Sequence, residues 1–216
     1  MSAGRDLYWA RHGENAANLS RRLSYRVYDG DLTEKGIAQA GELAETLLAD
    51  TPRAAGHPYQ LLICSPLRRA RQTADIVSAR LGLPIAAELE DLREVNVGDL
   101  DGRNDDAAWR CYDAILADWR DGQLDRRFPG GESGYELADR IRRALQAVAD
   151  RATGTAIVVA HGASIRAAVP PLTGEPDPGA DLATGGLARF TVTSTSDGGA
   201  EIVLAEWPSA ASPPST

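Results

Sequence analysis

The sequence predicts an α/β fold, a three-layer α/β/α sandwich with a mostly parallel central sheet. Short apolar runs alternate along the chain with longer segments of helical periodicity, as strands and their covering helices do. The final two runs are joined by Ser196-Asp197-Gly198-Gly199, a turn sequence typical of an antiparallel hairpin. A polar segment at about 96–131 interrupts the alternation. We therefore expect a helical cap excursion and a C-terminal antiparallel hairpin in addition to the sandwich.

The individual elements follow from local sequence patterns. Strands are expected where apolar, β-forming residues run together, at 6–10, 60–64, 85–89, 155–160, 188–194 and 200–206. Helices are expected at 33–49, 66–81, 105–120, 133–151 and 163–170. Thr33 can cap the first long helix, with Glu34 in its first turn. Ser133 and Glu136 form a capping box at the start of the fourth helix.

The cap segment carries three aromatic residues, Trp109, Tyr112 and Trp119, on one expected helix face. Such a stripe is more often packing than a ligand site, and packing is the expected role here. We assign residues 1–208 to a single domain that includes the cap. The Ser-, Ala- and Pro-rich segment 209–216 is expected to be a disordered tail.

Length and composition fit one soluble globular domain. The 216 residues are 43% hydrophobic and 25% charged. No apolar run approaches the ~20 residues of a membrane helix, and residues 1–6 do not resemble a secretory signal. Two cysteines form neither a disulfide framework nor a metal pattern. The expected location is therefore the cytoplasm, without membrane association.

The distribution of charge points to a small anionic ligand. A net charge of −8 argues against nucleic acid as a partner, because such binding needs a basic face. Positive charge is instead concentrated locally, in Arg21-Arg22 and in Arg68-Arg69-Ala70-Arg71. These arginines suit an anion in a pocket, and solvated surface positions are the alternative.

The first apolar run ends on Arg11 and His12. In open α/β sheets ligands bind beyond the carboxyl ends of the strands. A neutral imidazole there can attack a phosphoryl group that a guanidinium holds in place. Taken alone, a junction of this kind more often carries a structural histidine.

Two more strand-to-helix junctions carry related residues. Ser65-Pro66 is a helix-start signal, with Ser65 as the expected N-cap and Pro66 in the first turn. A helix N-terminus attracts anions, and Arg68 and Arg69 add full charges there, although surface arginines beside an ordinary N-cap are the alternative. The run 155–160 ends on His161. Because such junctions converge at one edge of a parallel sheet, we expect a phosphate site that contains a nucleophile.

The remaining histidine and the metal alternative need separate treatment. His57 lies in Gly56-His57-Pro58 and is expected to be an exposed turn residue. Catalytic zinc takes three protein ligands, often at short helical spacing, and neither His12 nor His161 has such neighbours. Flanking arginines would also repel a dication. We expect no metal and no other cofactor.

Five motifs, in the same order along residues 5–165, resemble those of the histidine phosphatase superfamily, also called the phosphoglycerate-mutase-like family. They are Arg11-His12-Gly13-Glu14 with Asn18 downstream, and the runs 32–40, 65–73, 92–98 and 158–162. The resemblance implies that His12 is the nucleophile that becomes a phosphohistidine. It also implies that Arg11, Arg69 and His161 surround the phosphoryl oxygens.

Glu94, within the fourth motif, matches the family's general acid, which protonates the leaving oxygen and then activates water. His12 must be neutral to attack, and nearby guanidinium charge favours that form. Glu94 must hold a proton near neutral pH, which a dianionic phosphate promotes by repulsion.

For the substrate side we assign four residues: Asn18, Arg22, Tyr25 and Arg26. Asn18 and Arg22 match the family's binding positions, while solvation in a loop is the alternative for the arginines. Ser24-Tyr25 departs from the pattern, because the family often has glycine after the residue that Arg22 matches. The segment 183–187 also lacks the family's usual asparagine.

Three functions remain to be compared. The first is a metal-independent phosphomonoester hydrolase acting on a small phosphorylated metabolite. The second is a bisphosphate-primed phosphoglycerate mutase. Against it, Val95 and Asn96 stand at the positions where mutases of the family have Arg and His. The third is a non-catalytic module that binds a phosphorylated ligand, which the complete set of site residues disfavours. Neither the substrate nor the oligomeric state is predicted by the sequence.

Overall fold

The computed structural model describes residues 4–50, 59–196 and 199–208. Within them, six strands form one sheet in the order β3-β2-β4-β1-β5-β6. Strands β1 to β4 run parallel, and β5 and β6 are antiparallel to their neighbours, as the sequence predicts. Their bounds are β1 (Arg5–Arg11), β2 (Tyr59–Cys64), β3 (Ile85–Glu88), β4 (Thr155–Ala160), β5 (Leu187–Ser194) and β6 (Ala200–Glu206).

Several predictions lie outside the described residues: those for the N-terminal residues 1–3, for His57, for turn residues 197 and 198, and for the tail at 209–216.

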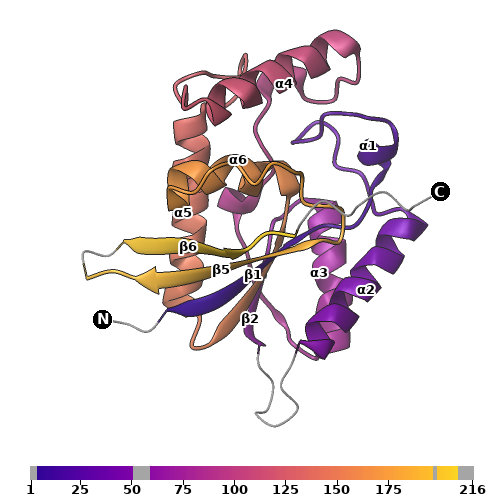
Figure 1. Cartoon of the computed structure of the whole chain (residues 1–216). Helices are drawn as coiled ribbons and strands as arrows, with labels where there is room; N and C mark the ends of the chain where they lie inside the picture. The colour runs from indigo at the N-terminus through magenta and orange to yellow at the C-terminus, as the bar shows by residue number, and fades with distance from the viewer. Residues whose placement is uncertain (1–3, 51–58, 197–198, 209–216) are drawn as a thin grey trace, which may run out of the picture.

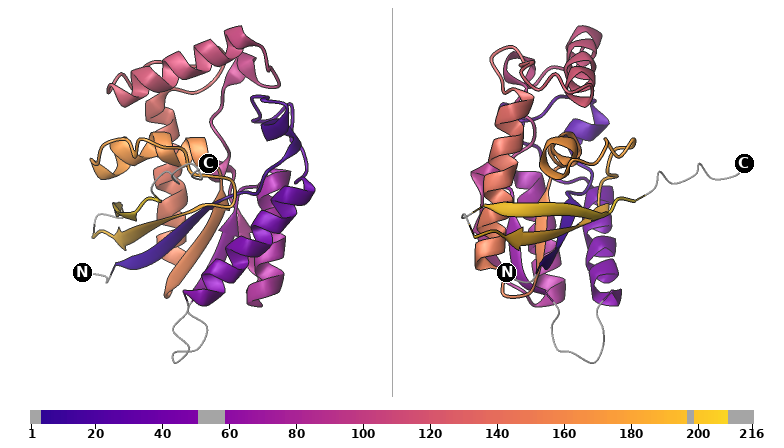
Figure 2. Two further views of the ribbon diagram at one scale, coloured as in Figure 1. Left: turned by 45° about the vertical axis from the view of Figure 1, so that its right-hand side comes forward. Right: turned by 60° about the vertical axis from the view of Figure 1, so that its left-hand side comes forward.

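Two pairs of helices cover the two faces of the sheet (Figures 1 and 2). One pair is α2 (Glu34–Ala49) with α3 (Arg68–Leu81), and the other is α5 (Gly134–Arg151) with α6 (Gly162–Thr173). Strand β1 supplies both hydrophobic cores by alternation: Leu7 and Trp9 pack on the α5 side, while Tyr8 and Ala10 pack on the α2 side. The fold is therefore the expected α/β sandwich.

The cap is formed by α4 (Asp106–Arg120), which lies above the carboxyl ends of the parallel strands (Figure 1). Asp105 caps the helix, because its carboxylate accepts a hydrogen bond from Ala108 N at 3.1 Å. Ile115 and Trp119 are buried in the same hydrophobic cluster as α5 and β1. The cap thus shares the main core with the sheet.

Two predicted helix ends were wrong. Helix α3 begins at Arg68 after Leu67, so Ser65 is not its N-cap and Pro66 lies before the helix. Helix α6 continues past Pro170 to Thr173. The two prolines remove hydrogen bonds only near the end of that helix, where Gly174 at φ 75° donates to Pro170 O at 3.0 Å and closes the last turn.

Three short elements escaped the sequence pattern: α1 (Ala16–Leu19), η1 (Glu90–Leu92) and η2 (Gly98–Leu100). Helix α1 is only one turn long and begins with a reciprocal capping box between Asn15 and Asn18. A single turn is too short to produce a visible apolar period, which explains the omission.

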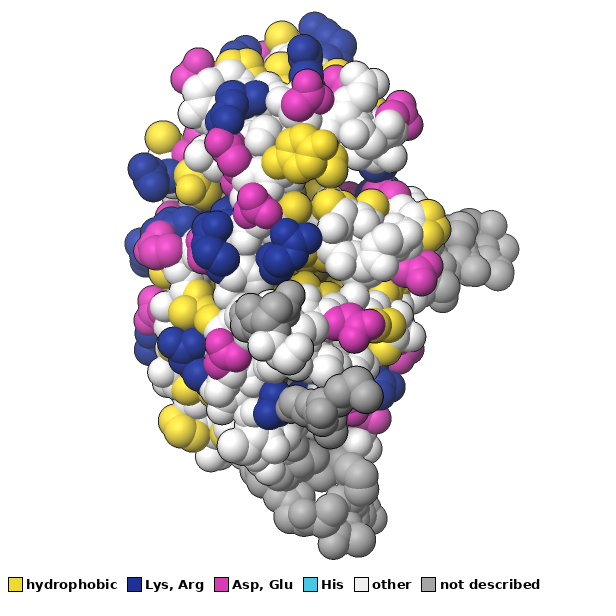
Figure 3. Space-filling model, turned by 90° about the vertical axis from the view of Figure 1, so that its left-hand side faces the viewer, with side chains coloured by type: hydrophobic (Ala, Val, Ile, Leu, Met, Phe, Trp, Pro, Cys, Tyr) yellow, Lys and Arg dark blue, Asp and Glu magenta, His cyan; other side chains and the backbone are white. Residues whose placement is uncertain are grey.

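On the face shown in Figure 3, basic and acidic side chains are interspersed and no histidine is visible. None of the helices in the described ranges is long and apolar enough to cross a membrane.

Candidate active site

The carboxyl ends of β1, β4 and β2 bring two histidines together. His12 follows β1 and donates its backbone N–H to Ala160 O at 3.0 Å, and Ser65 follows β2 and donates to Val159 O at 2.9 Å. His161 follows β4, which lies between these two strands. As a result, the imidazole rings of His12 and His161 lie with centroids 5.2 Å apart, and both are buried.

His12 is held as a neutral imidazole with a defined tautomer. Its Nε2 lies 3.1 Å from Arg69 Nε, which is always a donor, so Nε2 must accept. Its Nδ1 therefore carries the proton and donates to Gly13 O at 2.7 Å. Burial, together with the guanidiniums of Arg69 and Arg11, lowers the pKa of His12 well below its usual value. The lone pair of a buried, uncharged ring thus sits at Nε2.

Arg69 comes from the first turn of α3 and is almost completely buried. Besides contacting His12, its guanidinium donates to Ser24 Oγ at 3.2 Å and to Ser24 O at 3.0 Å. Asp29 lies 3.6 Å from the same guanidinium. The Asp29 carboxylate also accepts the Arg68 backbone N–H at 3.0 Å. The α3 N-terminus, expected to attract a ligand anion, therefore binds a carboxylate of the protein itself.

The loop that carries Ser24 is fixed by Asp101. The Asp101 carboxylate accepts three successive backbone N–H groups, from Tyr25 at 2.8 Å, Arg26 at 2.7 Å and Val27 at 2.6 Å. Ser24 departs from the family pattern, yet its hydroxyl and carbonyl both support Arg69. No periodicity in the sequence signals this role.

Arg11 and His161 each keep a buried nitrogen without a partner among the described residues, Nε and Nδ1 respectively. Arg11 donates to Leu182 O at 2.5 Å, and His161 Nε2 lies 2.8 Å from Ser65 Oγ. Burial and the charge of Arg69 lower the pKa of His161 well below its usual value. A Cβ at Gly162 would lie 2.8 Å from Arg11 Cδ, so a larger residue here would displace the Arg11 side chain.

Glu94 is placed at the N-terminus of α6. Its Oε1 accepts hydrogen bonds from Ser164 N at 2.8 Å and from Val95 N at 3.0 Å. The backbone that carries Glu94 is fixed by Arg140 of α5, which donates to Glu94 O at 3.0 Å and to Arg93 O at 2.8 Å. Glu132 pairs with Arg140 through both of its oxygens, each at 2.8 Å. No local sequence pattern signals this ion pair, because Glu132 lies before the start of α5 and eight residues from Arg140.

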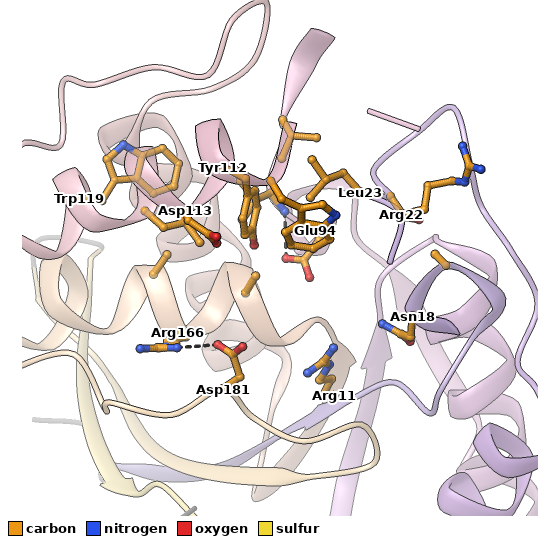
Figure 4. A pocket seen from close by; sticks show the side chains of 18 of the residues that line it. Arg11, Asn18, Arg22, Leu23, Glu94, Tyr112, Asp113, Trp119, Arg166 and Asp181 are labelled. Carbon is orange, nitrogen blue, oxygen red and sulfur yellow. Dashed lines mark hydrogen bonds and ion pairs between the residues drawn. The ribbon is translucent and has the colours of Figure 1, made fainter. Parts of the chain in front are cut away.

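These groups open into a cavity of about 280 Å³. Figure 4 shows α4 above the cavity and α6 below it, with Glu94 and Arg11 between this part and the side on which Asn18 lies. We call the part between α4 and α6 the outer cavity. The three aromatic residues of α4, Trp109, Tyr112 and Trp119, all line the cavity. They also pack, since the ring centroids of Trp119 and Phe128 lie 5.4 Å apart. The expectation of packing alone was therefore incomplete.

The four residues assigned to the substrate side fall into two groups. Asn18 and Arg22 line the cavity, whereas Tyr25 and Arg26 do not. Figure 4 shows the Arg22 guanidinium turned away from the cavity, where it donates to Gly102 O. The Arg26 guanidinium stacks over the Tyr25 ring at 5.6 Å. Asn18 alone of the four presents its side chain toward the site, with its Oδ1 held by Asn15 N at 3.0 Å.

No group of three or more His, Cys, Asp or Glu side chains suited to a metal ion occurs in the part of the chain that the structure describes.

Comparisons with known proteins match this chain over most of its length. The sequence model of the histidine phosphatase superfamily, branch 1, matches residues 7–208. A curated protein of Escherichia coli O1:K1 / APEC, "Probable phosphoglycerate mutase GpmB", is 34% identical over 171 residues, which cover 79% of this chain and 75% of that protein.

Solved structures show the same fold. A mycobacterial glucosyl-3-phosphoglycerate phosphatase in complex with VO3 has a TM-score of 0.73 and 27% identity, covering 94% of this chain and 98% of the other. A protein described as mycobacterial hydrolase 1 has a TM-score of 0.75 and 25% identity, covering 95% and 98% of the two chains.

Proposed function

Because this chain belongs to the histidine phosphatase superfamily, and is an enzyme of that family, we propose that it hydrolyses a small phosphate monoester through a phosphohistidine at His12, without a metal. The observation that carries the proposal is the pair of contacts made by the His12 ring, Nδ1 with Gly13 O and Nε2 with Arg69 Nε, from which the tautomer of His12 follows. Its proton is committed to Gly13 O at 2.7 Å, so the lone pair at Nε2 is the nucleophile.

In the first step, the Nε2 lone pair of His12 forms a bond to phosphorus while the bond to the leaving oxygen breaks. The electron pair of the broken bond goes to that oxygen, which takes a proton from Glu94. The phosphorylated ring gains positive charge. The hydrogen bond from its Nδ1–H to Gly13 O stabilises that charge. The hydrogen bond from Arg69 Nε to His12 Nε2 must break before the attack. Arg69 Nε can then donate to a phosphoryl oxygen.

In the second step, Glu94 removes a proton from a water molecule whose oxygen attacks phosphorus. The bond between nitrogen and phosphorus breaks, its electron pair returns to His12 Nε2, and inorganic phosphate leaves. Arg11, Arg69 and His161 stabilise the charge on the phosphoryl oxygens in both steps. The buried nitrogens of Arg11 and His161 without protein partners are the donors available for this purpose.

A phosphoglycerate mutase is the second candidate, because curated relatives are named so. In a mutase the phosphohistidine returns its phosphoryl group to another hydroxyl instead of to water. Val95 is buried beside Glu94 in this chain and offers no charge to a phosphoglycerate carboxylate. This favours hydrolysis.

The experiment is to trap the phosphoenzyme with labelled phenyl phosphate and to measure released phosphate. We expect an acid-labile protein label in the wild type and its loss in His12→Ala, with turnover reduced by at least about 10⁴-fold. His57→Ala, which removes the third histidine, is the matched control and should keep the label. A label that persists in His12→Ala would contradict the proposal. The appearance of 2-phosphoglycerate from 3-phosphoglycerate with a trace of bisphosphate would instead indicate the mutase.

A further inference from the structure

Ser65 lies completely buried beside the ring of His161. Its sequence motif predicted an N-cap, but α3 begins only at Arg68, so the hydroxyl does not cap that helix. Its Oγ instead lies 2.8 Å from His161 Nε2. The other ring nitrogen of His161, Nδ1, is buried and has no partner among the described residues. Ser65 therefore contacts the side of the ring opposite to the nitrogen that is left for a ligand.

The backbone holds the serine and the ring in this relation. Ser65 follows β2 and donates its backbone N–H to Val159 O of β4 at 2.9 Å. Trp9 of β1 donates its indole N–H to His161 O at 3.1 Å, and all of these side chains are buried. Because three neighbouring strands supply these contacts, the hydroxyl and the ring have little freedom to separate.

The Ser65 hydroxyl is better suited to donate to the ring than to accept from it. A hydroxyl has one proton to donate and two positions that accept. The Ser65 oxygen already accepts from Leu67 N at 3.3 Å. Among the described residues, His161 Nε2 is the one acceptor that the hydroxyl meets. Donation to Nε2 thus uses both functions of the hydroxyl.

The two possible tautomers of His161 differ in how many buried groups they leave unsatisfied. Burial and the charge of Arg69 keep the ring neutral, so one of its nitrogens carries a proton and the other does not. With the proton on Nε2, both the Nδ1 lone pair and the Ser65 proton would lack a partner in the described part of the chain. With the proton on Nδ1, only the Nδ1–H group lacks one. Buried polar groups without hydrogen bonds cost free energy, which favours the second tautomer.

We propose that Ser65 is a positioning residue, whose hydroxyl donates to His161 Nε2 and thereby fixes the ring proton on Nδ1, from which it is donated to a phosphoryl oxygen. The catalytic part of this inference rests on the proposed function, whereas the tautomer itself does not. Both histidines of the centre then carry their proton on Nδ1, but they use opposite nitrogens. His12 commits Nδ1 to Gly13 O and attacks through Nε2, while His161 commits Nε2 to Ser65 and donates through Nδ1.

Nuclear magnetic resonance measures the tautomer directly. In protein with nitrogen-15 labelled histidine, a ring nitrogen that carries a proton is distinguished from one that does not by its chemical shift. The signals that disappear in His161→Asn assign the ring. In the wild type near neutral pH we expect the proton on Nδ1 of His161. Inorganic phosphate should shift the Nδ1 signal, because this N–H group then gains an acceptor.

Ser65→Ala removes the hydroxyl and leaves the backbone contact with Val159 O in place. We expect the ring to lose its fixed tautomer, so that Nε2 carries the proton in a substantial fraction of the molecules. The kcat for phenyl phosphate should fall by about 10- to 100-fold, because one donor to the transition state is no longer preorganised. Ser164→Ala is the matched control for the tautomer, since that buried serine contacts His161 O and not the ring.

The outcomes separate this proposal from the proposed function. A proton on Nε2 of His161 in the wild type would overturn the inference, and this measurement needs no substitution, so it holds even if Ser65→Ala fails to fold. The same tautomer in the wild type and in Ser65→Ala, or an unchanged kcat in that variant, would also overturn it. If no phosphoenzyme formed in the wild type, the proposed function and the catalytic role of Ser65 would both fail, while the spectra would still decide the tautomer.

Discussion

The inner centre around His12 and the outer cavity are built by different means. In the centre, His12, Ser65 and His161 follow directly on parallel strands, and main-chain hydrogen bonds of the sheet edge fix two of them. In the outer cavity, Tyr112 and Asp113 project from the surface of a helix that belongs to the cap. The residues of the centre are thus positioned by the sheet edge, whereas the lining of the outer cavity is positioned by the cap helix and α6.

This contrast makes a general prediction about substitutions. Changes in the centre should lower the turnover of all esters in proportion, because they act on phosphoryl transfer itself. Changes in the outer cavity should alter the ranking of esters.

The largest effect is expected for Glu94→Gln. Glutamine keeps the oxygen that accepts from Ser164 N and Val95 N, so the backbone around it should be preserved. It has no proton to deliver as an acid and cannot act as a base. Turnover should therefore fall by about 100- to 10,000-fold for every ester, with inorganic phosphate still bound.

Steady-state kinetics and phosphate titration check this expectation. Glu90→Gln, four residues earlier on η1, changes an exposed glutamate outside the cavity and serves as the control. If Glu94→Gln kept wild-type turnover from acidic to neutral pH, Glu94 could not be the proton donor, and the centre would lack an assigned acid.

The second effect concerns the packing behind His12. A Cβ at Gly36 would overlap the backbone oxygen of Glu14, two residues after His12, whereas a Cβ at Gly41 has nothing within 4 Å. We expect Gly36→Ala to lower the free energy of unfolding by about 1–3 kcal/mol. Gly41→Ala, in the same helix α2, should raise it by about 0.5–1 kcal/mol. Urea denaturation measures the free energy of unfolding of both variants. Equal changes in the two variants would mean that Gly36 does not pack tightly against Glu14.

The third and smallest effect is a pH dependence of stability. Burial and nearby arginines lower the pKa of His12 and His161, so the folded protein keeps both rings neutral below the pH at which the unfolded chain protonates them. Protons taken up only by the unfolded state destabilise the fold as pH falls below about 6.5. Each ring contributes a slope of up to about 1.4 kcal/mol per pH unit.

His161→Asn should reduce this slope relative to the wild type between pH 6.5 and 5, as measured by urea denaturation at several pH values. Tyr112→Leu in the outer cavity should leave the slope unchanged, since a phenol does not titrate in that range. An identical slope in the wild type and His161→Asn would show that this ring protonates in the folded state.

The two regions also differ in how far the sequence could predict them. His12, Arg69 and His161 could be placed together because strand ends converge at one edge of a parallel sheet. Glu94 has no such signal, since it precedes no strand or long helix, and only its motif indicated it. The support it receives from Arg140 and Glu132 depends on tertiary geometry that no local pattern encodes.

Some groups predicted to bind a ligand instead contact other groups of the chain itself. The α3 N-terminus was expected to attract a ligand, but Asp29 from a distant loop binds it. Arg22 matched a binding position, yet its guanidinium turns to Gly102 O. The aromatic stripe of α4 could be recognised from its spacing, but the space beneath it depends on where α6 lies. The outer cavity was thus the least predictable part of the molecule.

The central position of β4 has a consequence for how the protein is made. Strands β1 and β2 touch β4 and not each other, so neither can form its inner pairing until residues 155–160 have been synthesised. At ordinary ribosomal rates, the stretch between β2 and β4 takes on the order of ten seconds to emerge. During that time the apolar residues of both earlier strands lack their neighbour. The nascent chain therefore passes through an interval of exposure to aggregation and to chaperones before His12 and His161 can meet.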